Sequence, residues 1–216
     1  MRVLIGCKHS GVMRRAFRRL GHDAWSNDIL PSDDDSEFHL QMDVFKAIAL
    51  QHWDLAIFHP DCTFLTCSAE WAYSDGPYHQ KVKPETLVGA ERRAARNAAV
   101  AFVAQLWAAD IPRKAIENPI GALSSRWRPA DQIVHPHWFG DDASKATGLW
   151  LDGLPLLKKT APVAPRLVMN NGKMRQRWAN QTDSGQNRLS PSPDRWKLRA
   201  DTYPGLAAAC ADQWGR

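Results

Sequence analysis

The sequence has little cysteine and no long hydrophobic run, and each absence excludes a class of protein. Four cysteines in 216 residues are too few for the disulfide framework of a secreted scaffold, so we expect free thiols. No apolar run approaches the ~18–20 residues of a membrane span, and the first residues lack the regions of a signal peptide. We therefore expect a cytoplasmic protein without membrane contact, and nothing indicates an obligate protein partner.

The charge of the chain is positive and unevenly distributed. The formal net charge is +5 and the sequence pI is about 9.2, which favours an anionic partner. Residues 28–43 are acidic, whereas the basic residues gather between 166 and 199, where they are Arg166, Lys173, Arg175, Arg177, Arg188, Arg195, Lys197 and Arg199. A polyanion should therefore meet the C-terminal third of the chain.

Strands and helices are expected to alternate over the first sixty residues. The hydrophobic pattern predicts strands at 3–7, 22–28 and 53–59 and helices at 12–20 and 45–50. This alternation is typical of a parallel α/β sheet. Further along, the pattern predicts a long helix at 86–109 and strands at 115–118 and 147–151. We expect one catalytic domain, formed by residues 1–157 and 191–216, with an irregular basic insert at 158–190.

Polar residues follow several of the predicted strands. Ser10-Gly11, Asp28, Cys62 and Glu117 each stand at or just beyond a strand end. Ligands of open α/β sheets bind beyond the carboxyl ends of the strands, so we expect these residues to share one site.

Cys62 and Glu117 suggest chemistry on a pyrimidine ring. A thiolate can attack an electron-poor carbon, although most free cysteines are simply small buried side chains. A carboxyl group can hold or protonate a ring nitrogen, although most glutamates lie on the surface. Together the two residues suit addition of a thiolate to C6 of a pyrimidine while a carboxyl group assists at N3.

Two aspartates suggest a nucleotide-like ligand. An acidic residue after the second strand, here Asp28, can hold ribose hydroxyls, and Asp43 stands at the end of a further probable short strand, in Gln41-Met42-Asp43-Val44. Turn formation is the alternative for both. The chain lacks a complete G-x-G-x-x-G fingerprint, so a dinucleotide site is poorly supported.

A metal site is not expected. His59, Cys62 and Cys67 lie within nine residues, but their spacing matches neither a paired C-x-x-C site nor a zinc deaminase. Cys67 should be packed, and Cys7 and Cys210 fall in apolar segments that favour the core.

The order of these motifs resembles that of the DNA cytosine C5-methyltransferases, in particular the short versions of phages and prophages. His9-Ser10-Gly11 is similar to the cofactor loop, Pro60-Asp61-Cys62 to the nucleophile loop and Glu117-Asn118-Pro119 to the E-N-V motif. The resemblance covers nearly the whole chain. It implies a Rossmann-like S-adenosylmethionine-dependent methyltransferase fold and DNA as the partner.

The resemblance also implies a role for individual residues. Cys62 would be the nucleophile and Glu117 the assisting carboxyl group. The implied S-adenosylmethionine contacts are Cys7, Ser10, Gly11, Val12, Asp28, Ile29, Asp43, Val44 and Pro60. The implied substrate or DNA contacts are Thr63, Asn118, Lys145, Thr147, Arg175, Arg177, Trp178 and Arg188.

The chain departs from the family pattern in ways that leave other functions open. Asp61 replaces a proline beside the nucleophile, and Ala143, Lys145 and Thr147 stand where the family has Q-x-R-x-R. The recognition insert is also small. Methylation of free deoxycytidine nucleotides is therefore one alternative, and a catalytically silent DNA-binding or accessory protein is another.

Overall fold

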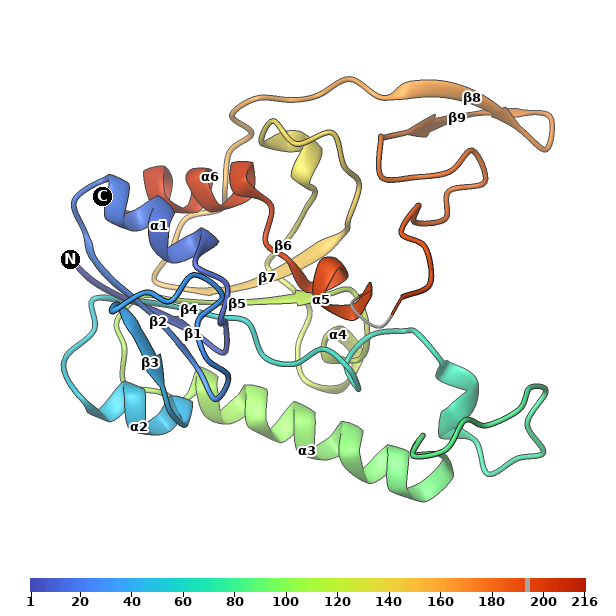
Figure 1. The fold of residues 1–216 in the computed structure, drawn as a ribbon, viewed down its shortest axis with the longest axis horizontal. Coiled ribbons are helices and arrows are strands. Elements are labelled where there is room, and N and C mark those ends of the chain that lie inside the picture. Colours follow the sequence, from blue (N-terminus) through green and yellow to red (C-terminus); the bar gives the residue numbers. More distant parts are fainter. Residues whose placement is uncertain (193–194) are drawn as a thin grey trace.

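A single seven-stranded sheet forms the centre of the computed structural model, which describes residues 1–192 and 195–216 (Figure 1). Its strand order is β3-β2-β1-β4-β5-β7-β6. The strands are β1 (Arg2–Gly6), β2 (Asp23–Asp28), β3 (His39–Gln41), β4 (Leu55–Phe58), β5 (Lys114–Pro119), β6 (Gln132–Val134) and β7 (Thr147–Asp152). β1 to β5 are parallel, and only β7 runs antiparallel to its neighbours β5 and β6.

Helices cover both faces of this sheet. The α-helices are α1 (Val12–Arg19), α2 (Val44–Ala49), α3 (Gly89–Trp107), α4 (Ala122–Arg126), α5 (Arg195–Ala200) and α6 (Pro204–Trp214), and two 3-10 helices are η1 (Glu70–Tyr73) and η2 (Pro136–Trp138). α1 and α6 lie on one face, and α2 and α3 lie on the other (Figure 1). This arrangement confirms the predicted α/β class with a mainly parallel, Rossmann-like sheet.

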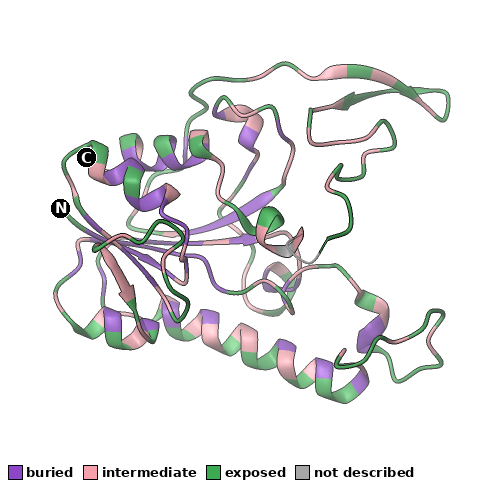
Figure 2. Ribbon diagram, in the orientation of Figure 1, coloured by how far each residue is buried: buried purple, intermediate pink, exposed green. Residues whose placement is uncertain are grey.

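The sequence of the central strands explains the two-sided core. Successive side chains of a strand point to opposite faces, so a strand with helices on both faces must be apolar throughout. In β1, Val3 and Ile5 pack toward α1 and α6, whereas Leu4 packs toward α2 and α3. All four residues of β4 are buried, and the central strands are the most continuously buried segments (Figure 2).

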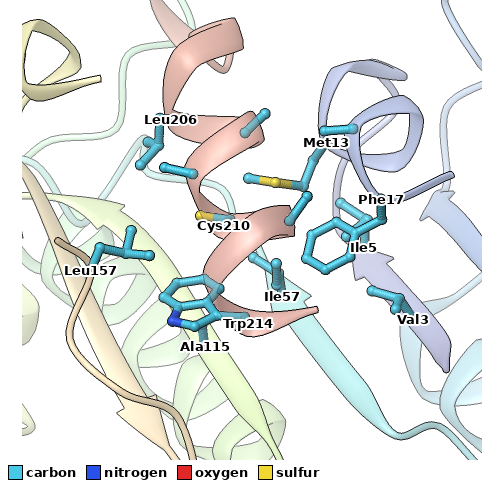
Figure 3. Packing of buried hydrophobic residues seen from close by; sticks show 14 of the residues in the cluster. Val3, Ile5, Met13, Phe17, Ile57, Ala115, Leu157, Leu206, Cys210 and Trp214 are labelled. Atoms are coloured by element: carbon cyan, nitrogen blue, oxygen red, sulfur yellow. The ribbon is translucent and has the colours of Figure 1, made fainter. Parts of the chain in front are cut away.

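The last helix, α6, covers the core on the face of the sheet that it shares with α1. Trp214 is 1% exposed and packs with Leu157 and Cys210 (Figure 3). Its indole nitrogen donates to the carbonyl oxygen of Pro155 at 2.9 Å. The expected core position of Cys210 is therefore confirmed, and α6 joins the start of the insert to the sheet.

Most elements expected from the sequence are present, short ones such as α2 and β4 included, but several other short elements were missed. The helix expected at 86–109 begins later, at Gly89, because this residue has φ +56° and Val88 is extended. β6, α4 and α5 were not predicted, since segments of three to six residues carry no clear periodicity. Residues 193–194, inside the predicted catalytic segment 191–216, lie outside the described residues.

The insert contains a β-hairpin, so the expectation of a wholly irregular segment was wrong. β8 (Arg166–Asn170) pairs antiparallel with β9 (Lys173–Arg177) through a turn at Asn171 and Gly172, which have φ +48° and +71°. Two positive φ values at Asn-Gly fit a tight hairpin turn. Figure 1 shows this hairpin projecting away from the sheet.

Two anchors fasten the hairpin to the segment around η2. On the entry side, the Val163 N–H donates to the carbonyl oxygen of His137 at 2.8 Å. On the exit side, the Asn180 amide pairs with both the N–H and the carbonyl oxygen of Ser144. Both ends of residues 164–179 are thus held by the same short stretch of chain.

None of the helices described is long and apolar enough to cross a membrane.

Candidate active site

The carboxyl ends of β1, β4 and β5 bring the predicted site residues to one edge of the sheet. The register aligns Gly6 with Phe58 and Phe58 with Ile116. The residues that follow these positions therefore begin at a common level, as the sequence predicted. Cys62 follows β4, and Glu117 is the next residue of β5.

A buried hydrogen bond joins His59 to Glu117. His59 Nδ1 lies 2.9 Å from Oε2 of Glu117, and the two side chains are only 5% and 18% exposed. Burial raises the pKa of Glu117, but the hydrogen bond with His59 and the charges of Lys145 and Lys8 outweigh burial and lower the pKa to about 2. Burial also lowers the pKa of His59. At neutral pH the pair is therefore a carboxylate and a neutral imidazole.

The loop after β4 holds Cys62 partly buried beside this carboxylate. The carbonyl oxygen of Cys62 accepts hydrogen bonds from the N–H groups of Leu65 and Thr66. Asn118 Nδ2 donates to the carbonyl oxygen of Pro60 at 2.9 Å, which ties the loop to β5. Cys62 is thus presented by a fixed turn and not by a free loop end.

The pKa of the Cys62 thiol is raised. Burial is the main cause, the charges of Asp61 and Glu117 add to it, and Lys145 opposes it. Because only the thiolate attacks carbon, the reactivity of Cys62 should rise with pH through the neutral range and beyond.

Replacing Asp61 with asparagine should accelerate alkylation of Cys62 by iodoacetamide about three- to tenfold at pH 8, because a like charge beside the thiol is removed. Peptide mapping by mass spectrometry would measure the rate for each cysteine. Cys67 is exposed and serves as an internal control whose rate should not change. An unchanged Cys62 rate would show that Asp61 does not control the thiol.

Two lysines that face Glu117 also fix the end of α5. Lys8 Nζ donates to the carbonyl oxygen of Ala200 at 2.7 Å, and Lys145 Nζ lies 3.4 Å from that of Asp201. Sequence reasoning assigned Lys145 to DNA and missed Lys8. A lysine directly after an apolar strand gives no sign in the sequence that it will be 8% exposed.

The residues implied for the cofactor lie along the ends of β1 and β2. Ser10 is 6% exposed, and its buried Oγ has no hydrogen-bond partner among the described residues. Asp28 accepts a hydrogen bond from the Leu30 N–H through Oδ1 alone. An unsatisfied buried hydroxyl and a free carboxylate oxygen fit a polar ligand.

The other implied cofactor residues surround these two with mixed exposure. Gly11 precedes α1 and Val12 begins it; Val44 and Pro60 are buried; Ile29 is 74% exposed. Asp43 caps α2, where its Oδ1 accepts from the N–H groups of Phe45 and Lys46. Cys7 has φ +57°, is partly buried and packs against the core, so its expected core position is confirmed in part.

Several implied DNA contacts are engaged within the protein. Thr147 is 2% exposed in β7, which leaves no surface for contact with DNA. Trp178 stacks on His137 at 3.9 Å and donates from its indole nitrogen to Val163. Arg177 and Arg188 donate to the carbonyl oxygens of Asp183 and Gln181.

The remaining candidates differ in exposure. Arg175 is exposed on β9, whereas Thr63 donates through its hydroxyl to Asp61. Cys67 is exposed, so the expectation that it is packed was wrong. Over residues 1–192 and 195–216, no three His, Cys, Asp or Glu side chains are grouped as a metal site would require.

Comparison with known proteins gives fold likenesses only. No protein-family model and no curated protein matches the chain. A prophage-encoded Escherichia coli protein described as a DNA modification methyltransferase matches 70% of this chain and 46% of its own, at 12% identity and TM-score 0.43. An rRNA methylase from Escherichia coli matches 70% and 56%, at 14% identity and TM-score 0.38. The chain thus spans about half of each structure, and likenesses of this size carry no argument about activity.

Proposed function

We propose that the chain is a DNA cytosine C5-methyltransferase that uses S-adenosylmethionine. The observation that carries the proposal is the meeting of the Cys62 loop and the Glu117 carboxylate at the ends of the adjacent strands β4 and β5. A nucleophile and a group that holds the ring are the two parts that addition to a pyrimidine requires.

Cys62 and Glu117 divide the work on the cytosine. The Cys62 thiolate bonds to C6, and the electron pair of the C5–C6 double bond moves toward C5, which becomes nucleophilic. Glu117 holds the N3 edge of the ring. As a carboxylate it accepts a hydrogen bond from the exocyclic amino group, and a proton taken up from solvent when the base binds bridges it to N3 while C6 is attacked. After C5 has been methylated, loss of the C5 proton re-forms the double bond and expels the Cys62 thiolate.

S-adenosylmethionine, when bound, would supply an electrophilic methyl group. Ser10 Oγ and the backbone at Gly11 would hold it near β1, and the Asp28 carboxylate would receive the ribose hydroxyls. Asp43 would lie near the adenine. The apolar neighbours would flank the ligand, namely Cys7, Val12, Ile29, Val44 and Pro60.

DNA is proposed to meet the protein along the basic insert, with residues 158–190 as a reduced recognition unit of the domain formed by 1–157 and 191–216. C5 and C6 of cytosine cannot be reached inside a duplex, so the base must leave the stack. Lys173 and Arg175 are exposed on β9 and are available for phosphate contacts. The further candidates are Lys145, Arg177, Trp178 and Arg188, which also make contacts within the protein.

Replacing Lys173 and Arg175 together with alanine should weaken DNA binding about tenfold and reduce the slope of log Kd against log salt by about 1.8, since each phosphate contact contributes about 0.9. Fluorescence anisotropy across a salt series would measure both quantities. Replacing Arg19 and Lys46 removes the same charge at α1 and α2, far from the hairpin (Figure 1). Equal weakening by the two double variants would contradict a DNA site on the insert.

The function itself is tested by trapping the covalent complex. The protein is incubated with methyl-labelled S-adenosylmethionine and DNA containing 5-fluorocytosine, whose fluorine cannot leave as the C5 proton does. A labelled protein–DNA adduct that survives denaturation is expected. Cofactor binding without an adduct, or no cofactor binding, would contradict the proposal.

Methylation of free deoxycytidine nucleotides is a second candidate. It is favoured by the internal engagement of the basic insert, because Arg166, Arg177 and Arg188 contact Asp183 or Gln181. Labelled methyl transfer to deoxycytidine monophosphate in place of DNA would support it. The third alternative, a silent DNA-binding protein, predicts DNA binding without transfer to either substrate.

A further inference from the structure

His59 has no assigned role in the function proposed above, yet it makes the one hydrogen bond of the Glu117 side chain among the described residues. The imidazole is 8% exposed at the end of β4 and bonds across to β5. Only Oε2 of Glu117 is engaged; among the described residues, no hydrogen bond reaches Oε1. The carboxylate is therefore fixed through one oxygen and free at the other.

We propose that His59 is a positioning residue for Glu117: its Nδ1–H holds Oε2, so that Oε1 is directed to the edge of the bound pyrimidine. This inference rests on the proposed function and deepens it. A buried carboxylate with one fixed oxygen keeps a single orientation, and orientation of this kind decides how well a group acts on a bound ring.

The environment of the ring fits this role better than simple packing. Nε2 of His59 is buried and has no hydrogen-bond partner among the described residues. A buried polar atom without a partner is unfavourable, and an apolar side chain of similar size would avoid it. The hydrogen bond from Nδ1 to Glu117 therefore explains why a histidine stands at this position.

Burial has the largest effect on the pKa of His59 and favours a neutral histidine as donor. Lys8, after β1, and Lys145, before β7, both disfavour the imidazolium, whereas Glu117 on β5 favours it. Asp61 and Cys62 lie on the same loop as His59. A neutral imidazole that donates from Nδ1 keeps Nε2 unprotonated, so the proposal fixes the tautomer.

The first test needs neither substrate nor variant activity. Nitrogen-15 correlation spectra of the wild-type protein should show His59 as the neutral Nδ1–H tautomer between pH 6 and 8. The chain has five glutamates, whose side-chain carboxyl carbons can be labelled with carbon-13. The signal of Glu117 is the one that is missing from the spectrum of Glu117→Gln. An Nε2–H tautomer would overturn the proposal.

The second test uses two variants of similar size. His59→Leu lacks the donor, so the Glu117 pKa should rise by a unit or more, because the hydrogen bond that opposes burial is lost and only the charges of Lys8 and Lys145 still oppose it. His59→Asn keeps an N–H near the Nδ1 position and should restore most of the shift. Equal Glu117 titrations in all three proteins would overturn the proposal.

Kinetics then separate this inference from the function. If the protein transfers methyl groups, His59→Leu should lower kcat about 10–100-fold with little change in KM for DNA, and His59→Asn should recover most of the loss. Equal kcat values in the two variants would overturn the positioning role. Absence of transfer by the wild type would refute the proposed function, while the spectra would still decide the His59–Glu117 pairing.

Discussion

Replacing Cys62 with alanine is expected to reduce methyl transfer by at least about 10³-fold, the size of loss typical when a covalent nucleophile is removed. The thiol is partly buried in a turn, so the free energy of unfolding should change by no more than about 1 kcal/mol. Initial rates with labelled cofactor and thermal unfolding would measure the two effects.

The matched control for this prediction is Cys67→Ala. Cys67 stands five residues further along the same loop and is exposed, so its loss should leave the rate unchanged. DNA binding should survive in both variants, because the basic insert is untouched. Undiminished methyl transfer by Cys62→Ala would refute the covalent mechanism.

Replacing Trp214 with alanine is expected to have the largest effect on stability. The side chain, at the end of α6, is 1% exposed and packs with Leu157. Its indole nitrogen donates to the carbonyl oxygen of Pro155. Truncating a buried tryptophan costs about 3–5 kcal/mol, a large part of the ~5–15 kcal/mol that stabilises a domain. Denaturant unfolding followed by circular dichroism would measure the loss.

Leu156→Ala is the control for the core prediction, because Leu156 is 55% exposed beside the same segment. It should lower the free energy of unfolding by less than about 0.5 kcal/mol. A similar loss in the two variants would mean that α6 does not close the core.

The parts of the fold that were predictable are those whose burial is imposed on both faces. β4, and β1 from Val3 onward, are apolar because helices cover them on each side, and α3 is long enough to show its period. The hairpin was missed because its strands are short and neither is buried, although Asn171-Gly172 was a turn signal that the sequence offered.

The sequence predicted which residues lie at the site, but not which of their side chains bond to one another. Strand ends identified Cys62 and Glu117 because parallel strands share one edge. Nothing in the spacing indicated that His59 would bond to Glu117, or that Lys8 would reach the end of α5. Such pairings depend on side-chain direction and on which strands are neighbours, which only the folded chain determines.

The two anchors of the hairpin have a consequence for how such chains can diversify. Val163 and Asn180 both hold to the stretch from His137 to Ser144, so residues 164–179 behave as a cassette with fixed ends. Recombination within those bounds would exchange the projecting surface while the sheet, the Cys62 loop and Glu117 keep their places. A library built on this chain should therefore vary the cassette and leave both fastenings intact.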